Sequence, residues 1–357
     1  MKSVLMKGNE ALAEGAVRAG CRFYAGYPIT PQSEILEYMA WRQDEVNGTF
    51  IQGESEIASA CMVFGAVASG ARAMTSSSSV GFTLKQEAIS YILGADLPAV
   101  FVTVVRFGNG GSTITVGQDA YWQSVKGGAH GDYRLIVLAP NSVQESADMA
   151  YISFALAEKY RQPVIIQSDA AIGQMVEGCV LPDMTEHDIN KYEWSAKGSS
   201  IDKKYKNIRD TLNFDMPKYV TDQTDKARRI MVEEQQWENY SVSDAEVIFV
   251  AYGISSRIAR ETVNLCRNNH IKAGLIRPKT LWPFPRKAFQ NLRNDVKAFI
   301  TIEMNIMGQM REDVLHAVRY QSPVYTYASN VEIPDSNTAA QMADDVLNGK
   351  IREEEVY

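Results

Sequence analysis

The sequence has few cysteines, and they do not form a pattern that is typical of a metal centre. The four cysteines are far apart and include no CxxC pair: Cys21, Cys61, Cys179 and Cys266. This spacing excludes the usual pattern of a zinc ribbon or a ferredoxin-type cluster within the chain, and it favours small buried side chains. The four histidines show no HExxH spacing, so we expect no metal site built from this chain alone.

Long apolar runs are missing as well. No run approaches the roughly 18 residues of a membrane-spanning helix, and the first residues lack the apolar core of a signal peptide. We therefore expect a cytoplasmic protein with no membrane partner. The net charge of −7 argues against a nucleic-acid partner, which would require a basic surface.

What the sequence does contain is an alternation of apolar runs and helical periodicity, which predicts an α/β fold. We predict two doubly wound, mostly parallel-sheet domains, at residues 1–185 and 244–357, joined by a long crossover arm at residues 186–243. The arm has weak periodicity, but its aromatic residues argue against disorder: Tyr192, Trp194, Tyr205, Phe214, Tyr219 and Trp237.

Caps, glycine stops and periodicity predict the individual elements. Strands are expected at 22–26, 49–52, 71–75, 97–105, 135–139, 163–168, 246–252, 273–276, 298–302 and 324–327. Helices are expected at 10–19, 31–41, 54–69, 82–93, 142–160, 228–238, 255–268, 285–292, 311–318 and 338–347.

The turn FYAGYPITPQSE, at residues 23–34, is the first candidate for a site. A short strand stops at Gly26, and Pro28 and Pro31 then fix φ and push the residues before them toward extended backbone. The stiff turn presents the Thr30 hydroxyl at the carboxyl end of a strand, where open α/β sheets bind ligands. An ordinary strand-to-helix turn is the alternative.

Four polar features each follow a predicted strand: Thr30, Glu56, the serine run at 76–79 and Arg106. In a parallel sheet these features meet at one edge, the carboxyl edge. This convergence indicates a site more strongly than any one of the residues does.

Glu56 opens a helix whose residues 57–67 are apolar nearly all round, which predicts a buried helix. Burial at its first turn would favour the protonated carboxyl group, whereas the helix dipole would favour the anion. Glu54 and Glu56 could also both be ordinary helix-start carboxylates, and periodicity does not separate them.

Arg106 ends the most apolar predicted strand, so its charge requires an anion as a partner. The planar guanidinium group is suited to bind a carboxylate. That anion is either a substrate carboxylate or a protein carboxylate such as Glu87 or Asp119. The glycine-rich loop at 107–113 lacks GxxxxGK[ST] and is predicted to be a flexible loop beside the substrate. His130 lies between glycines in KGGAHGDYR, so a hydrogen-bonding or acid–base role and a plain turn position are both open.

Together these motifs resemble the α subunit of the 2-oxoacid:ferredoxin oxidoreductases, thiamine-diphosphate enzymes that convert a 2-oxoacid and CoA into acyl-CoA and CO₂. The similarity covers nearly the whole chain, at residues 8–34, 54–66, 81–91, 102–106, 126–140, 277–285 (RPKTLWPFP) and 303–314. The segment KGGAHGDYR is most similar to subunits for branched-chain 2-oxoacids.

The resemblance implies that residues 1–185 form a pyrimidine-binding domain for thiamine diphosphate and that residues 244–357 form a transketolase C-terminal-like domain. It also implies a role for each cofactor-side residue. Glu56 matches the catalytic glutamate that hydrogen-bonds the aminopyrimidine of thiamine diphosphate and exchanges a proton with it. Tyr27, Pro28 and Ile29 would border the pyrimidine end of the cofactor.

The substrate-side residues follow from the same resemblance. Thr30 matches a threonine that contacts the 2-oxoacid, and Arg106 an arginine that binds its carboxylate. We place His130 with them as a substrate-binding residue. The loop after Arg106 departs from the family, because it reads FGNGGST where many relatives have GGPSTG or GGPGLG, and this difference bears on substrate choice.

The chain also lacks the GDG…N motif that holds Mg²⁺ and the diphosphate. In the resembling family this motif lies on a separate β subunit, and iron–sulfur clusters lie on partner subunits. We therefore expect a β subunit carrying Mg²⁺, γ and ferredoxin-like subunits, and ferredoxin as the electron acceptor.

The expected substrate is 2-oxoisovalerate, and 2-oxoglutarate and pyruvate are alternatives. Two other classes of protein are alternatives. A single-chain thiamine lyase would require the missing diphosphate motif. A non-catalytic scaffold or regulatory paralogue would be favoured by loss of Glu56 or Arg106, and both are present.

Overall fold

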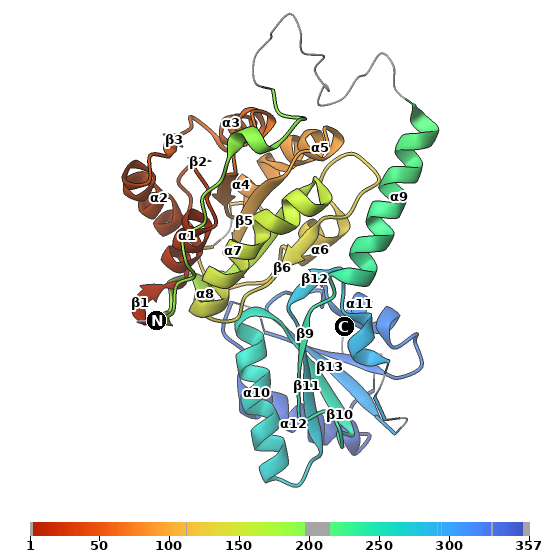
Figure 1. Ribbon diagram of the computed structural model, residues 1–357. Helices are drawn as coiled ribbons and strands as arrows, with labels where there is room; N and C mark the ends of the chain where they lie inside the picture. The colour runs from red at the N-terminus through yellow and green to blue at the C-terminus, as the bar shows by residue number, and fades with distance from the viewer. Residues whose placement is uncertain are drawn as a thin grey trace, which may run out of the picture.

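The computed structural model describes residues 3–111, 113–196, 215–290, 292–293, 295–329 and 331–352. Within these ranges the chain forms two large sheets and a small antiparallel pair, β1 (Val4–Lys7) with β8 (Val176–Cys179), as Figure 1 shows. No helix in these ranges is long and apolar enough to cross a membrane.

The first sheet has seven strands in the order β12-β6-β7-β5-β4-β2-β3. All neighbours are parallel except β12, which runs antiparallel to β6. The strands are β2 Phe23–Gly26, β3 Thr49–Gln52, β4 Ala73–Ser77, β5 Ala99–Val105, β6 Ile136–Leu138, β7 Pro163–Asp169 and β12 Thr280–Trp282. The central strands β5 and β7 are buried along their whole length, as parallel strands covered on both faces are.

Helices cover both faces of this sheet. One face packs against α1 (Gly8–Arg18), α2 (Ser33–Glu45) and α7 (Val143–Tyr160), and the other against α3 (Glu56–Ala68), α4 (Ser79–Leu84) and α5 (Gln86–Gly94). The alternation of side chains along β5 divides the core, since Val102 faces the first group and Phe101 the second. Two short helices, α6 (Tyr121–Lys126) and α8 (Ala170–Gln174), follow the loops after β5 and β7.

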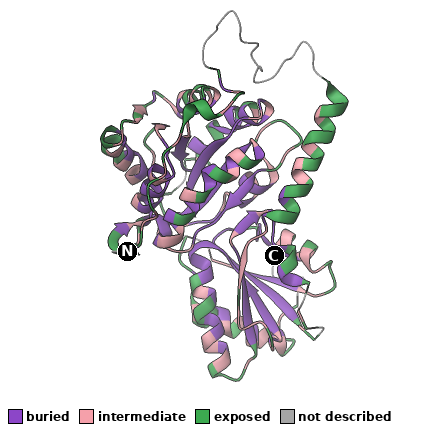
Figure 2. Ribbon diagram, viewed as in Figure 1, coloured by how far each residue is buried: buried purple, intermediate pink, exposed green. Residues whose placement is uncertain are grey.

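The second sheet has the order β14-β13-β10-β11-β9. Its strands are β9 Trp237–Tyr240, β10 Val247–Val250, β11 Ala273–Pro278, β13 Ala298–Glu303 and β14 Val324–Ala328, and only β9 is antiparallel to its neighbour. One face packs against α10 (Gly253–Asn268) and α12 (Ser336–Leu347). The largest core cluster joins the other face to the first sheet's helices, so the central strands of both sheets are buried in Figure 2, whereas the edge strands β3 and β9 are not.

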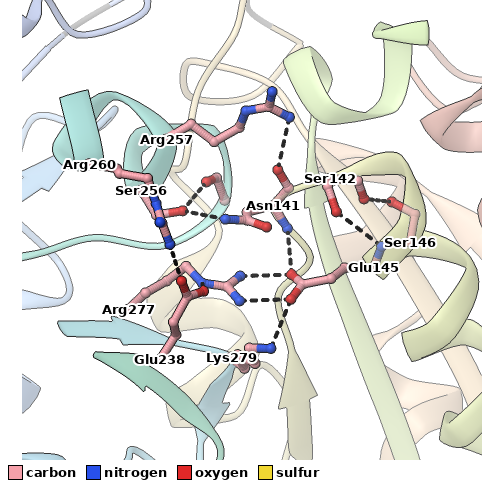
Figure 3. A network of polar contacts seen from close by, with 11 residues as sticks. Asn141, Ser142, Glu145, Ser146, Glu238, Ser256, Arg257, Arg260, Arg277 and Lys279 are labelled. Carbon is pink, nitrogen blue, oxygen red and sulfur yellow. Dashed lines mark hydrogen bonds and ion pairs between the residues drawn. The ribbon is translucent and has the colours of Figure 1, made fainter. Parts of the chain in front are cut away.

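A network of ion pairs links the two sheets (Figure 3). The Arg277 side chain, on β11, is 2% exposed. Its two terminal nitrogens donate to the Glu145 carboxylate of α7, both at 2.7 Å, and its Nε donates to Glu238 of β9 at 3.0 Å. Lys279 also pairs with Glu145 at 3.0 Å. Burial alone would raise the pKa of Glu145, but the hydrogen bonds and charge of Arg277 and Lys279 lower it to about 2.

Several predicted elements differ from the observed ones. The strand expected at 71–75 is β4, at 73–77, so Ser76 and Ser77 lie inside the strand. The helix expected at 82–93 is two helices that meet at Lys85, whose side chain is turned into the core. The helix expected from Pro31 begins at Ser33, after a Thr30–Pro31 peptide bond that is cis.

The predicted arm also differs. The helix expected at 228–238 is α9 (Met216–Glu233), which begins earlier because Asp215 caps it and Pro217 suits its first turn. β9 lies in the predicted arm but pairs with β11 of the second sheet. Where a helix was expected at 285–292, the described residues form a 3₁₀ turn (Arg286–Phe289), and Phe289 packs against Phe284 and Phe299. Residues 197–214, which include Tyr205 and Phe214, lie outside the described ranges, and the bounds of the three predicted segments stay a prediction.

Candidate active site

The carboxyl edge of the first sheet brings together the turns singled out in the sequence. β5, β4, β2 and β3 are adjacent and parallel. The YPITP turn follows β2, Glu56 begins the helix after β3, the serine run ends β4, and Arg106 follows β5. These are the positions at which doubly wound sheets bind ligands.

A buried hydrogen-bond network holds the YPITP turn. The Gln32 side chain donates to the Tyr27 carbonyl at 3.1 Å and accepts from the Ser76 hydroxyl, which also pairs with the Tyr24 hydroxyl at 2.6 Å. Tyr24, Gln32 and Ser76 are completely buried, whereas Tyr27, Pro28 and Thr30 are exposed and Ile29 is half-buried. The turn is therefore fixed from below and presents its outer surface.

Arg106 and the YPITP turn are in direct contact. Arg106 Nη1 donates to the Thr30 carbonyl oxygen at 2.8 Å, and Nη2 donates to the Gly111 carbonyl at 3.3 Å. Its Nε is buried without a hydrogen-bond partner among the described residues. Arg106 is 9% exposed, and within the described chain it forms no ion pair with a carboxylate. Neither Glu87 nor Asp119 neutralises it.

Asp119 is tied to the loop after Arg106. Its carboxylate accepts from the Gly108 backbone N–H at 2.6 Å, and burial raises its pKa. A cavity of about 180 Å³ is lined by Arg106 and Asp119, with Val80 and Val105 as apolar members. A larger groove of about 990 Å³ is lined in part by Thr30, which does not line the smaller cavity.

The structure separates Glu54 from Glu56. Glu54 is exposed and Glu56 is 7% exposed, at the first position of α3, where the Ser55 hydroxyl accepts from the Ala58 N–H. A Cβ on Gly81 would lie within 2.5 Å of Glu56 Oε1 and closer still to Ser77 Oγ. The carboxylate therefore lies against α4 beside Gly81, and a larger residue at position 81 would displace the Glu56 and Ser77 side chains. Its oxygens have no hydrogen-bond partner within the described ranges.

The helix that begins at Glu56 is not buried all round, contrary to the sequence prediction. One stripe, Ala60, Val63 and Val67, packs on the sheet. The opposite stripe is apolar but faces outward: Ile57 is 47% exposed, Met62 is 36% exposed and Cys61 is also exposed. α3 is therefore apolar on two opposite faces, and the described residues of this chain cover only one of these faces.

The sequence analysis missed Lys85. This side chain is completely buried, and its Nζ donates to the Thr75 hydroxyl at 2.6 Å. Burial lowers the pKa of Lys85 to about 7, although the charge of Glu56 acts to raise it. A signal was present, because Lys85 lies at helical spacing between Phe82 and Ile89, which are both core residues.

The structure does not join His130 to the other candidates. His130 is exposed, and its backbone carbonyl accepts from the Ser90 hydroxyl of α5 at 2.6 Å. No hydrogen bond of its imidazole is found in the described part of the chain. Its substrate-binding role stays a prediction, as do the roles of the other site residues.

Comparisons with known proteins agree with this architecture. Residues 14–249 match the family described as pyruvate flavodoxin/ferredoxin oxidoreductase, thiamine diphosphate-binding, and residues 245–336 match pyruvate:ferredoxin oxidoreductase core domain II. The ketoisovalerate oxidoreductase subunit VorB of Methanothermobacter marburgensis is 46% identical over 88% of this chain and 89% of its own length. The 2-oxoglutarate synthase subunit KorA of Methanocaldococcus jannaschii is 36% identical over 88% of this chain and 91% of its own length.

A solved structure has the same fold. It is the 2-oxoglutarate:ferredoxin oxidoreductase of Magnetococcus marinus with 2-oxoglutarate, coenzyme A and succinyl-CoA bound, with a TM-score of 0.84 and 23% identity. The similarity covers 97% of this chain and 65% of that chain. The fold and the family matches define the class: a subunit of a thiamine-diphosphate-dependent oxidoreductase. Within that class, the chain belongs to the 2-oxoacid:ferredoxin oxidoreductase family.

Proposed function

We propose that this chain is the α subunit of an enzyme that oxidatively decarboxylates 2-oxoisovalerate with CoA, releasing an acyl-CoA and CO₂ and passing electrons to ferredoxin. The observation that carries the proposal is that two oppositely charged and largely buried groups at one sheet edge, Glu56 and Arg106, form no ion pair within the described residues. Residue Glu56 is 7% exposed and no hydrogen bond of its carboxylate is found in the described part of the chain, while Arg106 has no carboxylate partner there and its Nε is buried without a partner. Buried charges in this condition mark a binding or catalytic site.

The Glu56 site fits the pyrimidine end of thiamine diphosphate. A free buried carboxylate suits a ring nitrogen that shares a proton with it, and Gly81 leaves room beside that carboxylate. Tyr27, Pro28 and Ile29 would border the ring from the fixed turn. When bound, the cofactor supplies the carbon nucleophile that attacks the 2-oxo group and accepts the electrons left by CO₂. Glu56 holds the proton that passes to and from the pyrimidine nitrogen.

Arg106 and Thr30 would bind the substrate. The Thr30 carbonyl fixes one edge of the Arg106 guanidinium at 2.8 Å, and the unpaired Nε is left for an incoming carboxylate. Thr30 would place its hydroxyl beside the same substrate group.

The cavity beside Arg106 favours a substrate with one carboxylate and a branched apolar side chain. Arg106 is the one cation among the described residues that line it, and Val80 and Val105 supply apolar surface. A second carboxylate, as in 2-oxoglutarate, would meet Asp119 instead of a cation. The identity to a ketoisovalerate oxidoreductase subunit, 46% against 36% for a 2-oxoglutarate synthase subunit, points the same way.

The active site requires a second chain. The sequence has no motif for the diphosphate and Mg²⁺, and the apolar side chains around Glu56 face outward on contacting helices: Ile57 and Met62 of α3, and Val80 and Leu84 of α4. A β subunit that carries the diphosphate motif would cover this face and bring the charged end of the cofactor. Iron–sulfur clusters on further subunits would take the electrons to ferredoxin.

The test is an assay of the assembled complex. The chain is purified with its β subunit and thiamine diphosphate, and a panel of 2-oxoacids is assayed with CoA and a low-potential dye. We expect the highest kcat/KM with 2-oxoisovalerate. A higher value with 2-oxoglutarate would refute only the choice of substrate. An assembled, cofactor-loaded complex that converts no 2-oxoacid would instead identify the chain as a non-catalytic scaffold.

A further inference from the structure

Lys85 is an unusual residue in this fold because it has no exposed surface. Fully buried lysines are rare, and an ammonium group has three N–H donors to satisfy. The Lys85 ammonium makes one hydrogen bond among the described residues, to the Thr75 hydroxyl at 2.6 Å. Packing alone does not account for this choice, since a methionine would fill the same space without the cost of burying an amine.

The surroundings of Lys85 connect it to Glu56. Gly81 lies one helical turn before Lys85, and a Cβ there would meet both Glu56 Oε1 and Ser77 Oγ. Ser77 and Thr75 are two residues apart on β4 and so lie on the same face of the sheet. Thr75, which accepts from Lys85, and Ser77, which lies beside Gly81 and Glu56, therefore line the same side of β4.

We propose that Lys85 is a positioning residue that keeps Glu56 in its carboxylate form from behind, so that Glu56 can share a proton with the pyrimidine nitrogen in front. This inference rests on the proposed function, because it requires Glu56 to face the cofactor. A buried carboxylate with no cation near it would be held as the neutral acid, which cannot accept that proton. Lys85 supplies the opposing charge without occupying the cofactor side.

The charges around Lys85 are consistent with this role. Glu56 is the group whose charge favours protonation of Lys85, and burial lowers the pKa of the amine to about 7. On β4 the facing side chains, Thr75 and Ser77, do not titrate. β5 carries no titratable residue, and Glu87 on α5 is exposed. Glu56 is therefore the one charged group among the described residues that is found to act on Lys85.

The decisive variant is Lys85→Met in the complete complex. Removal of the cation favours the neutral acid form of Glu56, so we expect the acid limb of the kcat/KM–pH profile to move up by about one pH unit or more. We expect the same displacement in the pH dependence of the dissociation constant of thiamine diphosphate, measured by fluorescence titration without turnover. A residue that only fills space would change neither profile.

Lys226→Met is the matched control. The Lys226 side chain is also mostly buried, but its Nζ pairs with Asp96 at 2.8 Å. This pair joins α9 to the turn after α5. We expect both pH profiles of this variant to match those of the unmodified complex. If Lys226→Met moves them as far as Lys85→Met does, the assignment to Lys85 is wrong.

Thr75→Val provides a second route if Lys85→Met does not fold. This nearly isosteric change removes the hydroxyl that accepts from Lys85 and so weakens the charged amine. We expect a displacement in the same direction, but smaller. Unchanged profiles in every folded variant overturn the inference. Glu56→Ala in the same complex tests the proposed function separately from the role of Lys85. An active Glu56→Ala complex would refute the cofactor role of Glu56 itself.

Discussion

Arg277 and Arg106 are two arginines of one chain that are both buried and yet differ in their partners. All three donor nitrogens of Arg277 meet carboxylates, from Glu145 and Glu238. Two of the nitrogens of Arg106 meet backbone carbonyls, and the third meets no group in the described chain. Arg277 lies near the end of β11 and Arg106 directly follows β5, and both lie in segments that resemble one family.

The difference shows how a structural charge and a functional charge can be told apart. A buried arginine whose fork is filled by protein carboxylates has no capacity left for a ligand, and removing it leaves those carboxylates uncompensated. A buried arginine without a carboxylate has paid the cost of desolvation and still lacks an anion, which a substrate can supply. The region around Arg277 therefore stabilises the arrangement of the two sheets, and the region around Arg106 and Glu56 is available for chemistry.

The largest expected effect is the loss of activity in Glu56→Ala. We expect turnover of the complex to fall by about 10²–10⁴-fold, the usual contribution of a positioned proton donor and acceptor, while assembly is unaffected. Activity assays and size-exclusion chromatography of the same sample measure the two. Glu56→Gln keeps the shape without the proton exchange and should be similarly impaired. Near-normal turnover in either variant would remove Glu56 from the mechanism.

The opposite pattern is expected for Arg277→Met. Breaking this buried network from its centre should lower the free energy of unfolding by about 3–5 kcal/mol, while kcat of the complex that does assemble stays close to normal. Denaturant unfolding followed by circular dichroism measures the loss. Arg293→Met is the control, because its pair with Asp295 is on the surface and should contribute little. Equal losses of unfolding free energy in the two variants would mean that the buried network contributes no more to stability than a surface ion pair does.

Acid should weaken the Arg277 region through Glu145. The pKa of this carboxyl group is lowered from its usual value to about 2, so its contribution to stability is present above about pH 4.5 and is lost as the pH falls toward 2. The contribution is about 3 kcal/mol. Unfolding free energies measured between pH 5 and pH 3 should therefore fall more steeply in the unmodified chain than in Glu145→Gln. Parallel curves would contradict this reading.

The smallest effect among these is expected for Arg106→Lys. Lysine keeps the charge but loses the planar fork that reaches both the Thr30 carbonyl and a substrate carboxylate. We expect kcat/KM for the 2-oxoacid to fall by about 10–100-fold, with little change in unfolding free energy. Steady-state kinetics and thermal unfolding test both parts. A loss of stability comparable to that of Arg277→Met would show that Arg106 belongs to the structural class after all.

Much of the first sheet could be read from the sequence because its signals are local. The strand at 49–52 was predicted with the bounds that β3 has, and Glu56 begins α3 as expected. The YPITP turn follows β2, because two prolines and a glycine leave the backbone few alternatives. These features depend on residues that are close together in the chain.

What could not be predicted depends on contacts between distant segments. β12 is three residues long and lies between Pro278 and Pro283, so only its pairing with β6 makes it a strand. The burial of Lys85 is invisible to a pattern that expects lysine at the surface, because the Glu56 and Thr75 groups that accommodate it come from other elements. The sequence pattern of α3 predicts burial on all sides, but one apolar stripe faces outward. Periodicity shows which residues are hydrophobic and does not show whether another surface covers them.

The place of β12 in the first sheet has a consequence for how the chain can be made. Its partner β6 precedes it by about 140 residues, so on the ribosome the first sheet is complete except for one edge while the second sheet is still being synthesised. Until residues 280–282 emerge, that edge offers unpaired backbone groups to any neighbouring chain. A gene divided between the two family segments would leave the first product with this edge permanently open, which predicts aggregation of the separate half and its rescue when the second half is supplied.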